Sequence, residues 1–143
     1  MYVLLSDLPV DSSIGGVAIF VSKKLRYRLC PEFNLDTNSK CKAENIWIEI
    51  EKFHKKFVIG GIYRHPAQSI LEFQNNLNVT LQKLSAKRLP VMVAGDINID
   101  LLKYSINNET QKYIDNLLMN NFLPLSLLPT RITEKSATII DHM

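Results

Sequence analysis

Hydrophobic positions along this chain follow two different periods, and the change between them separates a strand-rich half from a helical segment. Up to Tyr63, short runs of β-branched and aromatic residues predominate, which is typical of β-strands. Residues 17–21 are apolar throughout and follow Gly15-Gly16, which predicts a strand buried on both faces. Residues 26–29 alternate in polarity, which predicts a half-exposed strand.

A clearer strand pattern covers residues 46–51, after a polar stretch at residues 31–45 that predicts a loop. Successive side chains of a strand point to opposite faces, so the isoleucines of this segment share one face. Those isoleucines are Ile46, Ile48 and Ile50, with Glu49 and Glu51 on the other face. Trp47 is expected to pack under a helix or loop rather than stack on a nucleobase. A solvated, charged turn at residues 54–56 then leads into a strand at residues 57–63.

After Pro66 the hydrophobic period changes to that of an amphipathic helix. Ser69 and Glu72 have the spacing of a capping box, which places the start of the helix. The expected buried stripe consists of Ile70, Phe73, Leu77, Leu81 and Leu84. Leu89-Pro90 ends this helix.

The last third of the chain repeats the alternation of strand and helix. Residues 91–94 form an apolar strand that runs into Gly95, and residues 137–140 form a strand that ends at Asp141. A second helix is expected at residues 109–119. Its inward-facing residues are predicted to be Tyr113, Ile114, Leu117 and Leu118.

Composition indicates a single globular domain or part of one. The 143 residues are 46% hydrophobic and 22% charged, which is enough for one core and too little for two. The net charge of +3 would tolerate a polyanionic partner, but it is far from the dense basic stripe typical of nucleic-acid binding. Charge alone therefore does not name a partner.

Cysteine usage and hydropathy bear on the compartment. Cys30 and Cys41 have neither a second pair nor neighbouring histidines, so they suggest no zinc site and no disulfide framework. The apolar stretches are far shorter than a membrane span, and the first five residues lack the basic region of a signal peptide. We therefore expect reduced thiols, an intracellular setting in the nucleus or cytoplasm, and no membrane contact.

Candidate chemistry is concentrated at the ends of predicted strands. Asp96 and Asn98 lie two positions apart, so they are expected to project to the same side, where a carboxylate and an amide can orient water and bind an oxyanion. An isolated Asp-x-Asn more often simply punctuates a turn. Here, however, Tyr63 and Arg64 end another predicted strand and Asp141 ends a third.

Four motifs in this order resemble the endonuclease/exonuclease/phosphatase (DNase I-like) domain of non-LTR retrotransposons. They are Gly-Gly-Val-Ala at residues 15–18, Tyr-Arg-x-Pro at residues 63–66, Gly-Asp-x-Asn at residues 95–98, and Thr-Arg-x-Thr at residues 130–133 followed by Ser-Ala-Thr-x-x-Asp at residues 136–141. The resemblance implies a partial four-layer α/β sandwich, in which two packed β-sheets are flanked by helices. It also implies DNA as the partner and magnesium-dependent phosphodiester hydrolysis as the reaction.

The resemblance also implies roles for individual residues. Asp96 would position or deprotonate the attacking water, Asn98 would bond the phosphoryl oxygen, and Tyr63 would donate its hydroxyl to the phosphate. Asp141 would support a catalytic histidine. Arg64 could neutralise phosphate or serve as a surface ion-pair partner.

Polar residues near the end of the chain add candidate substrate contacts. Ser136 and Thr138, with Thr130 and Arg131, would suit contacts to a nucleic-acid backbone, and a hydrogen-bonded loop explains them nearly as well.

Departures from the family pattern limit these expectations. The family has a metal-binding glutamate on a strand before the Gly-Gly-Val-Ala motif and a Ser-Asp-His motif on a strand after the Asp141 segment. Neither can be located here, and motif position does not assign the metal role to Glu44 or Glu49. We therefore expect residues 1–143 to be a partial domain that holds magnesium poorly, does not hydrolyse DNA alone, and exposes sheet edges and apolar surface.

No histidine receives a catalytic role. His142 follows the family aspartate at a variable position and is expected to be structural or exposed, while His54 lies in the solvated turn and His65 varies in the motif. Two alternatives stay open. The chain could be a non-catalytic remnant that binds nucleic acid or protein, or another phosphatase or phosphodiesterase of the same superfamily.

Overall fold

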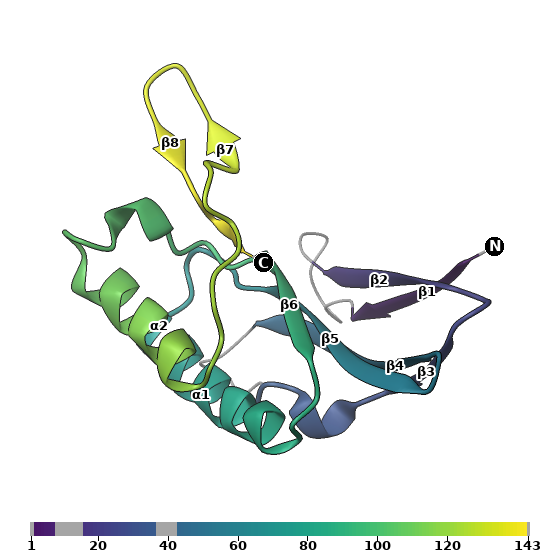
Figure 1. Ribbon diagram of the computed structural model, residues 1–143. Helices are drawn as coiled ribbons and strands as arrows, with labels where there is room; N and C mark the ends of the chain where they lie inside the picture. The colour runs from purple at the N-terminus through teal and green to yellow at the C-terminus, as the bar shows by residue number, and fades with distance from the viewer. Residues whose placement is uncertain (1, 8–15, 37–42, 143) are drawn as a thin grey trace.

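The computed structural model describes residues 2–7, 16–36 and 43–142 (Figure 1). Gly15 of the first motif and Cys41 lie outside these ranges. The strands are β1 (Tyr2–Asp7), β2 (Val17–Ser22), β3 (Arg26–Leu29), β4 (Glu44–Lys52), β5 (Lys55–Tyr63), β6 (Val91–Asp96), β7 (Arg131–Ile132), β8 (Ala137–Thr138) and β9 (Asp141–His142). The α-helices are α1 (Ile70–Ala86) and α2 (Asn108–Met119), and short 3-10 helices cover Pro31–Phe33 and Leu101–Lys103.

Five strands form the central sheet in the order β3-β4-β5-β6-β9. Only the β5–β6 pair is parallel, and α1 makes the crossover between these two strands. The antiparallel β1–β2 pair lies on one face of the central sheet, and α1 and α2 lie on the other (Figure 1). The result is a mixed α/β sandwich in which a five-stranded and a two-stranded sheet pack together with helices outside, as the family resemblance implied.

Trp47 anchors the core on the helix side of the central sheet. Its side chain is buried and meets the Phe33 ring edge-on, with ring centroids 6.3 Å apart. Its indole N–H donates to Asn45 Oδ1 at 2.9 Å. On the neighbouring strand stands Gly60, where any side chain would collide with the indole ring. The prediction that Trp47 packs inside the protein is therefore confirmed.

Both predicted helices are present. Ser69 caps α1 by accepting the Glu72 backbone N–H at 3.4 Å. Phe73, Leu77, Leu81 and Leu84 form its buried stripe, and Ile70 is partly buried. In α2 the side chain of Tyr113 is buried, and Ile114 and Leu117 pack against the core. Leu118 was predicted to face inward and is instead 46% exposed.

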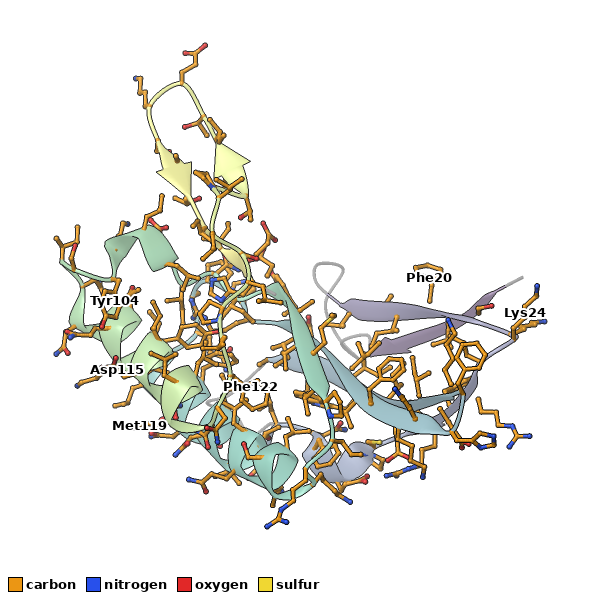
Figure 2. The ribbon with its side chains drawn as sticks, viewed as in Figure 1. Phe20, Lys24, Tyr104, Asp115, Met119 and Phe122 are labelled. Carbon is orange, nitrogen blue, oxygen red and sulfur yellow. The ribbon has the colours of Figure 1, made fainter. Side chains whose placement is uncertain are left out.

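Two strand predictions need correction. Residues 17–21 are not buried on both faces, because Phe20 on the outer face of β2 is 69% exposed and points away from the central sheet (Figure 2). An unbroken apolar run does not reveal that only one of its faces is covered. Residues 26–29 form a strand whose four residues are all exposed, since β3 is the edge of the central sheet.

Residues 137–140 do not form one strand ending at Asp141. Residues 137 and 138 belong to the β7–β8 hairpin, and Asp141 begins β9. Side-chain oxygens interrupt the ladder between them, because the backbone N–H groups of Ile139 and Ile140 donate to Asp100 Oδ1 and Thr130 Oγ1. The hairpin ladder therefore ends before the predicted site residue, Asp141, which pairs with β6 instead.

The expected apolar surface is present beside β6. This strand pairs with β9 only at its last two residues, and Met92 is 47% exposed. Leu123, Leu125 and Leu127, in the segment after α2, are also exposed. Cys30 is buried with a free thiol. Neither helix in the described ranges is long and apolar enough to cross a membrane.

The packing of α1 yields a stability prediction. Leu77→Ala should lower the free energy of unfolding by roughly 2 to 5 kcal/mol, because the side chain is 2% exposed and its removal leaves a cavity. Val79→Ala on the same helix is the control, since Val79 is 51% exposed and should change the stability little. Chemical denaturation measures both, and equal losses would contradict the assigned burial.

Candidate active site

Four residues from four neighbouring strands lie across one end of the central sheet, and we refer to them as the strand-end row. Glu44 of β4 is the direct partner of Tyr63 of β5. Asp96 of β6 is the direct partner of Asp141 of β9. The two pairs are joined where the backbone N–H of Arg64, next to Tyr63, donates to the carbonyl of Asp96 at 2.9 Å.

The sheet register places the row on the face that carries the β1–β2 pair. A side chain at Gly61 would meet Val17 of β2, so Gly61 and Tyr63, two residues on, face that pair. His142 packs against Tyr113 on the helix side, so its neighbour Asp141 points to the opposite face. Direct cross-strand partners share a face, which places all four row residues together.

The turn after β6 brings Asn98 next to Asp96. The backbone N–H of Asn98 donates to Asp96 Oδ1 at 3.1 Å, and its side-chain amide donates to the carbonyl of Arg64 at 2.8 Å. Asn98 has a φ of 53°, a left-handed conformation that asparagine adopts more readily than most residues. Asp96 and Asn98 therefore belong to one hydrogen-bonded unit.

Burial raises the pKa of Asp96 above its ordinary value. The hydrogen bond from Asn98 opposes this change in pKa, and the nearby charge of Asp141 adds to it. A carboxylate with a raised pKa accepts a proton from water more readily than an exposed one. The environment of Asp96 therefore suits a group that orients or deprotonates water.

Arg64 lies inside the protein rather than at the surface. Its side chain is 1% exposed, and its guanidinium donates to the carbonyls of Ile97 at 2.6 Å and Asn98 at 2.7 Å. Burial lowers the pKa of Arg64. From the sequence, Arg64 was expected to contact phosphate or to form a surface ion pair. Neither role matches the buried position, because both require an exposed side chain.

The two predicted substrate-binding residues near the end of the chain lie on the β7–β8 hairpin, which projects from the body of the protein (Figure 1). Ser136 is exposed near the hairpin tip and shares a hydrogen bond with Thr133. Thr138 Oγ1 is buried. At the base of the hairpin, Thr130 Oγ1 accepts the Asp141 backbone N–H at 3.2 Å. This hydrogen bond attaches the hairpin to the strand-end row.

His142 is a structural residue, one of the two alternatives expected from its motif position. Its Nε2 lies 2.9 Å from the carbonyl of Ile99, so Nε2 carries the proton and Nδ1 accepts from the Tyr113 hydroxyl at 3.0 Å. Burial lowers the pKa of His142. Burial also raises the pKa of Tyr113. This pair fixes β9 against α2 on the side opposite Asp141.

Glu44 is the residue of the row that sequence reasoning did not assign. One carboxylate oxygen accepts the backbone N–H of Gly16 at 2.7 Å, which connects the start of β2 to the central sheet. Motif position did not reveal it. The sequence signal that could have done so is the antiparallel pairing of β4 with β5, which sets Glu44 opposite Tyr63.

Asp96 and Asp141 of the row, together with the neighbouring Asn98, are residue types that bind magnesium in proteins. Asp96 and Asp141 offer carboxylate oxygens and Asn98 an amide group, and Mg²⁺ in proteins is commonly held by one or two carboxylates together with water and substrate phosphate. Among the residues that the structure describes, no group of three or more His, Cys, Asp or Glu side chains could hold a metal ion.

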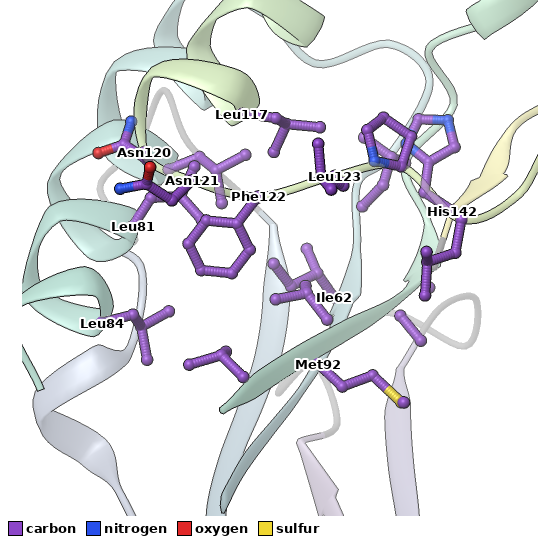
Figure 3. A pocket seen from close by; sticks show the side chains of 18 of the residues that line it. Ile62, Leu81, Leu84, Met92, Leu117, Asn120, Asn121, Phe122, Leu123 and His142 are labelled. Carbon is purple, nitrogen blue, oxygen red and sulfur yellow. The ribbon is translucent and has the colours of Figure 1, made fainter. Parts of the chain in front are cut away.

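An apolar cavity of about 480 Å³ lies behind the row, between β6 and the segment that follows α2 (Figure 3). Ile62, Leu117 and Phe122 line it, and Gly95 and His142 close the end nearest the row. Its lining resembles the edge of a core rather than a site for a charged substrate. The chemistry is therefore assigned to the row and not to the cavity.

Comparison with known proteins gives matches in structure but not in sequence. No protein-family model matches the chain, and no curated protein matches it significantly. The structure is similar to the endonuclease domain of TRAS1, a telomere-specific non-LTR retrotransposon, with a TM-score of 0.73 and 15% identity. This match covers 99% of the present chain and 65% of the TRAS1 chain.

Two structures of TDP2 from D. rerio are similar at lower scores. A version humanized by 14 mutations has a TM-score of 0.58 at 15% identity, and a complex with a single-strand DNA product has 0.55 at 14%. Each match covers 99% of the present chain and 59% or 60% of the TDP2 chain. The present chain thus has a DNase I-like fold and spans less than two thirds of the length of these structures.

The buried state of His142 leads to a pH prediction. Its pKa in the folded protein is below 6.5, so the unfolded chain binds the proton more readily. The free energy of unfolding should therefore fall as the pH drops below about 6.5, and this loss should disappear in His142→Gln. Denaturation between about pH 8 and pH 5 measures it. As the control, His54→Gln removes an exposed histidine and should show the same loss of stability at low pH as the unmodified chain. An unchanged pH dependence in His142→Gln would contradict the assigned burial of His142.

Proposed function

We propose that this chain carries the site of a nuclease domain that hydrolyses phosphodiester bonds in DNA with the help of magnesium. The observation that carries the proposal is the direct pairing of Asp96 with Asp141 at the strand ends, with Tyr63 and Asn98 beside them. A tyrosine hydroxyl, an amide and two carboxylates at one sheet end are the groups that phosphodiester hydrolysis uses.

Each residue has a distinct role in the proposed reaction. Asp96 orients or deprotonates the attacking water, because burial raises its pKa and its Oδ1 is already fixed by Asn98. Asn98 and Tyr63 donate hydrogen bonds to phosphate oxygens as negative charge builds on them. Asp141 holds position beside Asp96 through its backbone bond to Thr130.

Magnesium, when bound, would neutralise charge on the phosphate, and Asp96 and Asp141 are the residues that would hold it. DNA as the substrate is supported by the endonuclease name of one structural neighbour and by the DNA product bound to another. We also propose that this domain comes from a retrotransposon. This origin is supported by the four motifs together with the similarity to the TRAS1 domain.

The 143 residues alone are proposed to be inactive. Asp96, Asp141 and Asn98 would leave magnesium held mainly by water, because no group of three or more His, Cys, Asp or Glu side chains among the described residues could hold a metal ion. Weak binding would leave the ion absent for most of the time, and catalysis needs the reacting groups in fixed positions.

The test is a plasmid-nicking assay with and without magnesium. The 143-residue chain should not nick DNA, whereas the same region, extended at both ends with its native flanking sequence to a full domain, should nick it. Asp96→Ala in the extended form should abolish the activity, and Asp36→Ala, at an exposed aspartate, should leave it intact.

The outcomes separate the two parts of the proposal. If the extended domain is folded and does not nick DNA, the proposed function is wrong. If the short chain itself nicks DNA, and the activity needs magnesium and disappears in Asp96→Ala, the function stands and the predicted inactivity is wrong.

A further inference from the structure

The residues that follow β5 and β6 are joined by one buried side chain, that of Arg64. Its Nε donates to the carbonyl of Ile97 at 2.6 Å and its Nη2 to that of Asn98 at 2.7 Å. Its Nη1 reaches the other loop, donating to the carbonyls of Gln68 at 2.7 Å and His65 at 3.3 Å. The guanidinium therefore ties the turn after β6 to the loop after β5.

The backbone of Arg64 makes further bonds to the same turn. Its N–H donates to the carbonyl of Asp96 at 2.9 Å, and its own carbonyl accepts the side-chain amide of Asn98 at 2.8 Å. Two of the residues proposed to act on the substrate, Asp96 and Asn98, are thus bonded to Arg64. Neither bond involves the Asp96 carboxylate, which stays directed into the row.

Burying this cation has a cost, which the surrounding carbonyl dipoles, an aromatic ring and the nearby charges of Asp96 and Glu109 offset without a direct ion pair in the part of the chain that the structure describes. The ion pairs found among the described residues do not include Arg64, and the Phe73 ring lies 6.0 Å from its guanidinium carbon. A planar fork can donate to several carbonyls at once, which the compact ammonium of a lysine cannot reproduce. The geometry therefore requires arginine specifically and not merely a positive charge.

We propose that Arg64 is a positioning residue, which holds Asp96 and Asn98 in place by bonding the carbonyls of the turn after β6, and which does not contact the phosphate itself. Its effect on catalysis rests on the function proposed above, whereas its effect on the turn does not. An arginine that follows a strand in a nuclease-like motif is more readily expected to bind phosphate. The structure points to the opposite assignment.

The first test is hydrogen exchange in the 143-residue chain with Arg64→Lys, which keeps the charge and loses the fork. The backbone amides of Ile97 and Asn98 should exchange at least about tenfold faster, the change expected from losing one hydrogen bond. The amides of Leu77 and Leu81, in the core of α1, should stay protected. Unchanged exchange at Ile97 and Asn98 would overturn the proposal.

The second test separates positioning from phosphate binding by the salt dependence of DNA affinity. A phosphate-binding arginine contributes about one unit to the slope of log affinity against log salt, so its loss should reduce the slope by that amount. Arg64→Met should leave the slope unchanged, as should Arg26→Met at an exposed position that serves as control. A reduced slope in folded Arg64→Met alone would overturn the proposal.

In the extended, active domain, Arg64→Lys should lower kcat without raising KM for DNA. The variant displaces the turn after β6 while the contacts to phosphate remain. A raised KM with unchanged kcat would show that Arg64 binds the substrate. If the chain binds no DNA, the proposed function loses its partner, but the exchange test still decides whether Arg64 holds the turn. If Arg64→Met does not fold, the proposal is decided by the exchange and kinetic measurements on Arg64→Lys.

Discussion

The close approach of β6 to β5 at Gly95 is the constraint on which the strand-end row depends. Gly95 has a φ of 150°, which is rare for residues with side chains, and a Cβ there would overlap the carbonyl of Ile62. Because Gly95 has no side chain, β6 stays close to β5 beyond their last paired residues, Gly61 and Ala94. Asp96, the last residue of β6, therefore lies between the ends of β5 and β9, where its carbonyl accepts the backbone N–H of Arg64.

Local sequence patterns predicted the parts of the fold that local interactions determine. The stripe from Phe73 to Leu84 and the cap at Ser69 depend on residues three or four positions apart, so helix α1 could be predicted closely. Burial of residues 17–21 depends on which surface covers each face, a long-range property, and Phe20 is exposed for that reason. Asp141 begins a strand instead of ending one because Asp100 and Thr130, both distant in sequence, take the preceding N–H groups.

The same distinction holds for the candidate site. Strand-end positions were enough to select Tyr63 and Asp96 as candidate site residues, because the motifs mark where β5 and β6 end. Glu44 was missed because its place beside Tyr63 follows from the register of a long antiparallel pair. Arg64 was interpreted as an exposed group because a charged residue is rarely buried without a charged partner, and only the fold shows carbonyl oxygens arranged around it.

The burial of Arg64 changes the electrostatics of the site. Asp96 and Asp141 pair at the strand ends, whereas the guanidinium of Arg64 is buried and donates to backbone carbonyls. A phosphodiester that approached these two carboxylates would meet negative charge, and the effect of Asp141 on the pKa of Asp96 shows that the two carboxylates repel one another. The guanidinium of Arg64 is bonded to the carbonyls of the turn, so it is not available to bond a phosphate at this end of the sheet. In the proposed reaction, magnesium would offset this negative charge in addition to its chemical role.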